Sequence, residues 1–466
     1  MRAVEIAPAL IKAAGALNDE QREIVAHKSG PLLVVAGPGS GKTRSLTFLA
    51  MNLLLCRDAE PSQIVLCTYT EKAAYELQDR LTRIAGEINY PGDISQLRVG
   101  TIHGICQRLV NEYLHHTSLG SGYEMLDNFT QQLLIFDHLA EICPKNTLPF
   151  FQDRWGTPWE IAKRLKFYFD TIAEELVFEK LKNDIERLKG HKTRDDILLH
   201  YLTHAYNSYC VKLRDTNSTD FAHLQKWAYK LLTTPDTFQK ITSDIRYVLV
   251  DEYQDTNYIQ EQILIFLASG SESKNLVVIG DEDQALYRFR GATVRNILTF
   301  TQKFPDCREI HLTINYRSQA EIISACNRWI EDFDWSNGDG PRLRTAKTMR
   351  AGSAQRSDQA LLRLDAVDIQ DEAEQFADLV AKLKEQGKID DYSDVALLLH
   401  SVRFGMSDKY IDALNAKNIP YYCPRARAFF DQSEVKIMLG CFARILRYSA
   451  DTYSPLKDTD DFSEYL

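Results

Sequence analysis

The segment AGPGSGKT at 36–43 constrains this chain more than any other part of it. It follows an apolar strand pattern, PLLVVAG at 31–37, and precedes a helical pattern, TRSLTFLAMNLLL at 43–55. The order of strand, glycine-rich turn and helix is typical of a phosphate-binding loop, because glycines let the backbone turn tightly and point its amide N–H groups at phosphate oxygens. We therefore expect an α/β fold that holds a nucleotide at this turn.

Individual residues of the loop have predicted contacts. Lys42 would reach the β- and γ-phosphates, and Thr43 would place its hydroxyl on Mg²⁺. The strict pattern has glycine at its first position, where this chain has Ala36, a side chain small enough to fit. An ordinary glycine-rich turn is the alternative, and the intact GKT makes it the weaker interpretation. The predicted phosphate-binding residues are Ala36, Gly37, Pro38, Gly39, Ser40, Gly41, Lys42 and Thr43.

A second segment, LVDEYQDTN at 249–257, supplies paired carboxylates. Asp251 and Glu252 end the apolar strand pattern RYVLVDE at 246–252, which would put them at the carboxyl edge of the sheet. There Asp251 would hold Mg²⁺, and Glu252 would take the proton from an attacking water. By itself, an acidic pair after a strand is most often a solvated turn. Its combination with a phosphate-binding loop favours the second half of one nucleotide site.

Strand and helix patterns alternate in the first part of the chain and return after a long helical stretch. Residues 105–235 are helical and aromatic-rich without strand alternation, which indicates an insertion into the sheet domain. Beyond about residue 318 a second α/β unit is expected. The strands predicted for the first sheet lie at 31–37, 63–69, 97–104, 246–252, 275–281 and 309–317. The second unit has predicted helices at 320–332 and 371–386 and predicted strands at 394–400 and 419–423.

Composition sets limits but does not choose a partner. The 466 residues are too many for one compact core, and no apolar run approaches the ~18 residues of a membrane span. Nine scattered cysteines suit reduced thiols better than disulfides or a zinc site, so we expect a cytoplasmic protein without a membrane partner. The acid-rich tail at 451–466 contributes to the net charge of −10, which leaves room for a local basic groove that binds DNA.

Several segments together carry a family resemblance. They are NDEQREIV at 18–25, VDEYQDTN at 250–257, GDEDQALYRFRGA at 280–292, NYRS at 315–318 and IPYYCPRARAFFDQSEVKIML at 419–439. In this combination the chain resembles the UvrD/PcrA/Rep type of superfamily 1 DNA helicases. The resemblance implies a RecA-like P-loop domain with a parallel sheet and a helical insertion, and then a second, incomplete RecA-like α/β domain. The implied limits are 1–104 and 236–300 for the first domain, 105–235 for the insertion, 301–450 for the second domain and 451–466 for an acidic tail.

The resemblance also implies roles around the nucleotide. Gln21 would read the adenine edge, and Arg44 and Tyr316 would sandwich the ring. Gln284 and Arg317 would contact the γ-phosphate, with Arg317 acting as an arginine finger in cis. Such a group stabilises the charge that develops in the transition state.

The same resemblance implies a track for DNA. The implied contacts are Tyr69, Thr70, Thr101, His103, Tyr287, Phe289 and Arg290. Aromatic faces suit a protein that must accept any sequence, because every base has a π-face. For Tyr69 and Ile102 core packing is nearly as good an interpretation, and for His103 the alternative is a structural histidine. Tyr287 and Phe289 alternate with arginines, which favours contact with nucleic acid.

The chain departs from the family pattern at several places. Phe289 stands where the family usually has tryptophan, Glu71 where asparagine is common, and Ile102 where phenylalanine is common. The family's later motif of threonine, histidine, lysine and glycine, and a second arginine for the γ-phosphate, are not found. We therefore expect a second α/β unit whose sheet lacks some of its neighbours.

Two functions of different classes follow from these patterns. The leading hypothesis is an ATP-dependent DNA helicase that uses Mg²⁺ and moves 3′→5′ on single-stranded or tailed duplex DNA. The alternative is an ATP- and single-strand-binding module that does not unwind, either truncated or completed by a protein partner. A small-molecule kinase also uses a phosphate-binding loop, but it leaves DEYQDTN, YRFR and NYRS without a reason.

Overall fold

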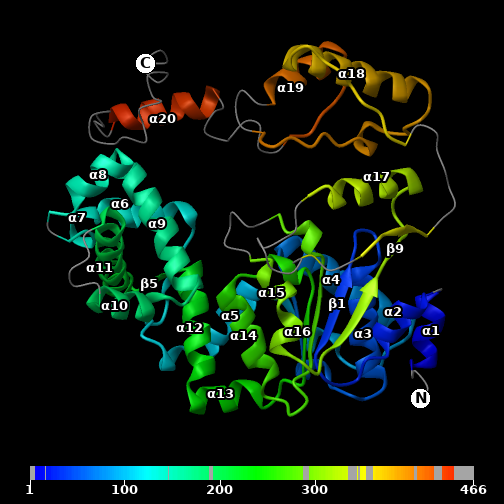
Figure 1. Cartoon of the computed structure of the whole chain (residues 1–466), viewed down its shortest axis with the longest axis horizontal. Coiled ribbons are helices and arrows are strands. Elements are labelled where there is room, and N and C mark those ends of the chain that lie inside the picture. Colours follow the sequence, from blue (N-terminus) through cyan, green and yellow to red (C-terminus); the bar gives the residue numbers. More distant parts are fainter. Residues whose placement is uncertain are drawn as a thin grey trace. The chain divides into compact units, whose positions relative to one another are not determined.

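The computed structural model describes residues 6–15, 17–144, 146–187, 193–286, 293–333, 344, 347–352, 360–402, 407–423 and 433–445. The chain divides into two units, Met1–Asp358 and Gln359–Leu466. The first unit contains the large sheet and the helices that cover it (Figure 1).

A six-stranded parallel sheet forms the centre of the first unit. In spatial order its strands are β3 (Arg98–Thr101), β2 (Ile64–Thr68), β6 (Tyr247–Val250), β7 (Leu276–Gly280), β1 (Leu32–Ala36) and β8 (Arg308–Leu312). All six strands predicted for this sheet are confirmed. A parallel α/β architecture follows, because each strand returns to the same edge through a helical connection.

The last strand of this sheet lies beyond the boundary expected between the two domains. That boundary was placed between residues 300 and 301, yet β8 pairs along β1 from Leu32↔Arg308 to Ala36↔Leu312. The pairing satisfies the backbone groups on the side of β1 that β7 leaves open. The sheet therefore extends past residue 301. The domain limits stay predictions.

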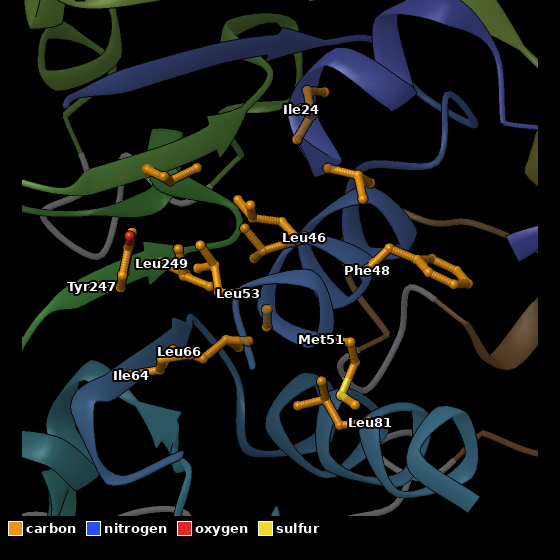
Figure 2. Close-up of a cluster of buried hydrophobic side chains, with 14 of the residues drawn as sticks. Ile24, Leu46, Phe48, Met51, Leu53, Ile64, Leu66, Leu81, Tyr247 and Leu249 are labelled. Carbon is orange, nitrogen blue, oxygen red and sulfur yellow. The ribbon is translucent and has the colours of Figure 1, made fainter. Parts of the chain in front are cut away.

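Alternate side chains of each strand enter two hydrophobic clusters on opposite faces of the sheet. Leu32 and Val34 join one cluster with the helices at 19–25, 42–55 and 71–87, whereas Leu33 and Val35 join the other with the helices at 102–112, 221–233 and 258–268. This period of two is the geometry of a strand covered on both faces. Figure 2 shows the first cluster, in which Leu46 and Leu53 of α3 lie against Leu249 of the sheet.

Helices surround the sheet on both faces. They are α1 (Pro8–Ala14), α2 (Asp19–Val25), α3 (Lys42–Leu55), α4 (Glu71–Glu87), α5 (Ile102–Glu112), α12 (Phe221–Thr233), α13 (Pro235–Thr242), α14 (Tyr258–Ala268), α15 (Arg295–Leu298) and α16 (Phe300–Lys303), while α17 (Ala320–Glu331) follows the sheet. The capping boxes of α2, from Asn18 and Gln21, and of α14, from Asn257 and Gln260, fix where these helices begin. No helix in the described ranges combines the length and apolar character needed to cross a bilayer.

The predicted helical insertion is present, with a hydrophobic core of its own. Its elements are β4 (Glu124–Leu126), α6 (Asn128–Asp137), α7 (Leu139–Ile142), α8 (Leu148–Trp155), α9 (Pro158–Glu174), α10 (Phe178–Arg187), α11 (Arg194–Asp215) and β5 (Ser218–Asp220). Phe169 of α9 stacks on Tyr209 of α11 with ring centroids 4.9 Å apart. The short parallel pair β4–β5 was not predicted, because three residues are too few for a visible alternation.

Two short strands follow the sheet within the first unit. β9 (Ile314–Asn315) and β10 (Arg350–Ala351) pair in parallel. Gly352 N–H also donates to the Asn315 carbonyl at 2.8 Å. This pairing places residues 347–352 beside the NYRS segment.

The second unit contains the predicted helix at 371–386 but not the predicted strands. Its elements are α18 (Ile369–Glu385), the 3₁₀ turn η7 (Tyr392–Asp394), α19 (Asp408–Ala416) and α20 (Ser433–Ile445). Residues 394–400 and 419–423 form no strand, which corrects both predictions. Leu398 and Tyr422 are each 90% exposed, so these segments lack the neighbours and the covered faces that parallel strands require.

We expect Ile64→Ala to destabilise the first unit by about 2–5 kcal/mol, since Ile64 is fully buried at the start of β2 and its removal leaves a cavity. Ile11→Ala is the matched control, because Ile11 is 56% exposed. Urea denaturation followed by circular dichroism would measure both changes. Equal losses of stability for the two variants would contradict this account of the core.

Candidate nucleotide site

The carboxyl ends of the parallel strands bring the predicted nucleotide residues to one cavity. Its volume is about 210 Å³. It is lined by Pro38, Gly39, Ser40, Gly41, Lys42, Thr43, Arg44, Arg80, Glu252, Gln284 and Arg317. The loop after β1, the acid after β6, the turn after β7 and the segment after β8 thus meet as the sequence predicts. Ligands of open parallel sheets bind at this edge.

The loop itself has the backbone that a phosphate cradle needs. Gly39 has φ +67° and Gly41, the N-cap of α3, has φ +86°, a region that residues with a Cβ rarely adopt. A Cβ at Gly39 would lie 2.7 Å from Asn315 Oδ1 and 2.8 Å from Arg317 Cβ. The glycine therefore permits both the turn and the close approach of the NYRS segment.

Two contacts join the loop to the acidic pair. The Lys42 ammonium lies 3.0 Å from Glu252 Oε2, and the Thr43 hydroxyl donates to Asp251 Oδ2 at 2.8 Å. Burial, and then the neighbouring Glu252 charge, raise the pKa of Asp251 to about 6. The carboxylate stays ionised at neutral pH, where it can accept the hydroxyl bond or bind a cation.

Glu252 occupies a strained backbone position. Its φ of 53° and ψ of 44° lie in the left-handed region, which costs a non-glycine residue roughly 1–2 kcal/mol. Its side chain is held from two sides, because Gln254 Nε2 donates to the same Oε2 at 2.8 Å that contacts Lys42. Strain of this kind persists where the surroundings fix a functional side chain.

The acidic residues after β7 are tied to the same network. Gln254 Oε1 accepts the Asp281 N–H at 3.0 Å, and the Gln284 side-chain amide donates to the Asp281 carboxylate. Gln284 lies in the 3₁₀ turn η5 (Glu282–Gln284) and lines the cavity. A continuous chain of contacts therefore runs from Lys42 through Glu252 and Gln254 to Gln284.

The donor set fits Mg²⁺, which prefers oxygen ligands and keeps several of its waters. Thr43, which lines the cavity, and Asp251 place two oxygens 2.8 Å apart. Asp255 Oδ1 nearby is buried without a hydrogen-bond partner. No cluster of three His, Cys, Asp or Glu side chains able to hold a metal occurs in the described part of the chain, so phosphate and water would have to supply the remaining ligands.

The three residues expected to contact the adenine ring lie around the glycine-rich loop. Gln21 is buried, and its amide donates to the Ser40 carbonyl at 2.9 Å, while its oxygen accepts the Asn18 N–H at 3.2 Å. The amide end of Gln21 thus holds the loop and its oxygen completes the capping box of α2, so reading adenine would require an exchange of these partners. Arg44 is exposed over the Phe48 ring at 5.6 Å and also borders a neighbouring cavity of about 300 Å³. Tyr316 is 53% exposed beside Asn18.

The residues expected at DNA are engaged in different ways. Thr70 and Thr101 cap α4 and α5 by accepting backbone N–H groups at 3.2 and 3.0 Å. The Thr101 hydroxyl donates to the Glu71 carboxylate at 2.8 Å, so this unusual acid lies at the end of β3. Ile102 is buried in the core, which agrees with core packing, the alternative to DNA contact. Tyr69 is partly buried.

His103 has protein partners on both sides of its ring. Its Nε2 lies 3.1 Å from Gln225 Nε2, and Phe221 meets the ring edge-on at 5.5 Å between centroids. Burial lowers the pKa of His103 to about 4, so the ring is neutral and accepts the Gln225 N–H. A neutral imidazole does not attract phosphate by charge, and any DNA contact of His103 would be through its ring. Tyr287, Phe289 and Arg290 lie outside the described residues.

Sequence reasoning missed several residues of this region. Arg80 of α4 lines both cavities, and the sequence analysis did not predict it. Lys347 is buried against Asp281 and lies 2.9 Å from Glu282, and Arg344 donates to Asp283 at 2.7 and 2.9 Å. The basic composition of residues 336–359 was the one available signal for these two cations.

Comparison with known proteins identifies this arrangement. Residues 17–305 match the UvrD/REP helicase N-terminal domain, and residues 310–457 match the UvrD-like helicase C-terminal domain. The chain belongs to the UvrD/REP helicase family. The resemblance inferred from the motifs is thereby confirmed.

Relatives in the UvrD/REP family include proteins named ATP-dependent DNA helicase PcrA. The protein from Staphylococcus epidermidis is 29% identical over 443 residues, which cover 94% of this chain and 55% of the relative. The protein from Staphylococcus aureus is also 29% identical, over 94% of this chain and 54% of the relative. The chain thus spans about half the length of these relatives.

We expect Gly39→Ala to weaken ATP binding roughly tenfold or more, since its Cβ would collide with Asn315 and Arg317 and its φ is positive. Gly30→Ala is the matched control, because Gly30 has φ +87° but no heavy atom within 4 Å of an added Cβ. Fluorescence titration with a labelled ATP analogue would compare them. Unchanged affinity in Gly39→Ala would show that this approach of the two segments is not needed for binding.

Proposed function

We propose that this UvrD/REP-family chain binds ATP with Mg²⁺ at the 210 Å³ cavity, hydrolyses it, and uses the turnover to move 3′→5′ on single-stranded DNA and unwind tailed duplex. The observation that carries the proposal is the convergence of Lys42, Glu252, Gln284 and Arg317 on that cavity. The family match and the name of the relatives support it. The direction of movement rests on the family resemblance alone.

The proposed hydrolysis starts from the contact between Lys42 and Glu252. A triphosphate oxygen would compete with Glu252 for the Lys42 ammonium, which lies 3.0 Å from the carboxylate. Once released, Glu252 Oε2 would accept a proton from the attacking water while Gln254 keeps it oriented. Mg²⁺ held by Thr43 and Asp251 would neutralise charge on the phosphate oxygens.

Arg317 and Gln284, which also line the cavity, would stabilise the negative charge that develops on the phosphate oxygens during hydrolysis. Arg317 projects from the segment after β9, whose Asn315 Oδ1 accepts the Arg317 N–H at 2.8 Å. Gln284, held by Asp281, would sense the γ-phosphate from the strand-end turn. Because the guanidinium is supplied by the same chain, no second protein is required for this step.

Turnover matters for opening DNA because stacking alone is too weak. A base stacked on a protein aromatic is worth roughly 1–3 kcal/mol, whereas one stacking step of DNA averages about 1.4 kcal/mol. A few aromatics such as Tyr287 and Phe289 can therefore hold a frayed end but cannot open a long duplex. Coupling to ATP through Gln284, three residues before Tyr287, would supply the rest.

The second candidate is an ATP- and single-strand-binding module that a protein partner completes. The segments at 394–400 and 419–423 form no strand and expose Leu398 and Tyr422. They favour this candidate, because these side chains would gain cover from added strands. This module would bind nucleotide and DNA without unwinding by itself. An unwinding assay on a 3′-tailed duplex separates the two functions.

We expect Lys42→Ala to abolish ATP hydrolysis and Glu252→Gln to retain ATP binding while reducing turnover by a factor of roughly 100 or more. The amide keeps the shape of Glu252 but cannot accept the proton. Phosphate release with and without single-stranded DNA would measure both, with Lys12→Ala on α1 as the control. Hydrolysis by Lys42→Ala at the parent rate would exclude this site as the ATPase.

We expect Glu71→Gln to bind single-stranded DNA about fivefold more tightly, since a repulsive charge near 4 Å costs about 1 kcal/mol in water. The amide can still accept the Thr101 hydroxyl, so capping at the end of β3 is preserved. Glu76→Gln on the same helix is the matched control. Fluorescence anisotropy at two salt concentrations would compare them, and equal changes in both variants would place the DNA track elsewhere.

A further inference from the structure

The helical insertion contains a Cys–His–Asp cluster that the nucleotide site does not use. Cys210 Sγ of α11 lies 3.5 Å from His223 Nε2 of α12. The other ring nitrogen, His223 Nδ1, lies 2.9 Å from Asp220 Oδ2, and Asp220 also caps α12 by accepting the His223 N–H at 2.8 Å. Capping explains why aspartate and histidine meet, but it gives no reason for a thiol at the free nitrogen.

Further donors surround the same groups. The Tyr209 hydroxyl donates to Asp220 Oδ2 at 2.6 Å, which keeps that carboxylate fixed and ionised. On the other side, the Lys226 ammonium lies 3.1 Å from the Tyr206 hydroxyl and 5.2 Å from the centre of its ring. Cys210 therefore faces an imidazole, a phenol and an ammonium.

The electrostatics favour a charged pair of sulfur and imidazole. Burial alone would raise the pKa of Cys210, but the charge and hydrogen bond of His223, the charge of Lys226 and a hydrogen bond from Tyr206 hold it below its ordinary value. Burial alone would lower the pKa of His223, yet Asp220 and Cys210 raise it. The thiolate is the form of cysteine that acts as a nucleophile.

The cluster opens onto a cavity of about 690 Å³. Cys210 and His223 line it together with Lys226 and Trp227 of α12. The volume lies within the range of about 300–1,000 Å³ typical of small-molecule sites. Cys210 itself is only half-buried, so a small reagent in this cavity can reach the sulfur.

The other charged groups around the cluster come from four helices. Arg214 of α11, Lys230 of α12 and Glu179 of α10 line the cavity. From α9, Asp170 pairs with Lys166 at 2.9 Å, and Glu174 is half-buried on the same helix. Burial, then Asp170 and Asp220, raise the pKa of Glu174 to about 8, so it is neutral over most of the range from pH 6 to 8. Cations thus outnumber anions on the cavity wall.

We propose that Cys210 is a reactive nucleophile and a modification site for peroxides and other small electrophiles that enter this cavity. With hydrogen peroxide, the thiolate attacks one oxygen, an S–O bond forms and the O–O bond breaks. Sulfur is oxidised to the sulfenic acid and the peroxide is reduced. The leaving hydroxide takes the proton from His223 Nε2 and departs as water, which leaves a neutral imidazole. This site is separate from the ATP site and does not depend on the proposed function.

The test follows alkylation of individual cysteines in the full chain by iodoacetamide between pH 6 and pH 8, with peptide mass spectrometry as the readout. Cys326, an exposed thiol on α17, is the internal reference. An ordinary thiol with a pKa of about 8.5 should react roughly 80-fold faster at pH 8 than at pH 6. Cys210 should change by a smaller factor than Cys326 and should react faster than Cys326 at pH 6. A rise in step with Cys326, or no labelling of Cys210 at pH 6, overturns the proposal.

Variants separate activation from simple exposure. His223→Gln should restore the steep pH dependence of Cys210, whereas His204→Gln, an exposed histidine on α11, should leave its flat profile unchanged. Dilute hydrogen peroxide at pH 6 followed by dimedone should label Cys210 and not Cys326. Labelling of both cysteines alike, or an unchanged profile in folded His223→Gln, contradicts activation by the cluster. If His223→Gln does not fold, the profile of the parent chain still decides.

Discussion

The parallel pairing of β1 with β7 on one side and β8 on the other is the contact on which the nucleotide site depends. The register Val35↔Gly280 and Ala36↔Leu312 brings the ends of three strands to the same level of one edge. The glycine loop, the turn with Gln284 and the segment with Arg317 each begin where one of these strands stops. A register slip of one residue in any of these strands would turn all its side chains to the opposite face of the sheet. The residues that now line the nucleotide cavity would then no longer lie together.

A chain of side-chain contacts makes this edge a single unit. Glu252 Oε2 is shared by Lys42 and Gln254, and Gln254 holds the backbone of Asp281. If Lys42 exchanges Glu252 for another partner, the contacts of Gln254 with Glu252 and with the backbone of Asp281 change as well. Asp281 begins the turn that precedes residues 285–292. The contacts are short and at least partly buried, and networks of this kind have few alternative arrangements. We regard this as the physical route by which nucleotide could influence the aromatic segment.

The three acids after β7 would repel one another without nearby cations. Lys347, almost fully buried, lies against Asp281, Glu282 and Asp283, and Arg344 makes two bonds to Asp283. Buried carboxylates of this density require such partners, since an uncompensated charge in the interior is costly. Arg344 and Lys347 thus serve the site from outside its motifs. Met349 also lies against Gly37, where a Cβ would meet its sulfur.

Local patterns in the sequence determined the six strands, the glycine loop and the acidic pair, because period-two burial and backbone freedom depend on near neighbours. The family motifs likewise identified Gln284 and Arg317. Only the tertiary structure decided that β8 belongs to the first sheet, that residues 394–400 form no strand, that His103 meets Gln225, and that Cys210 meets His223. These depend on which surfaces pack together, and a side chain's partner and pKa follow from that packing.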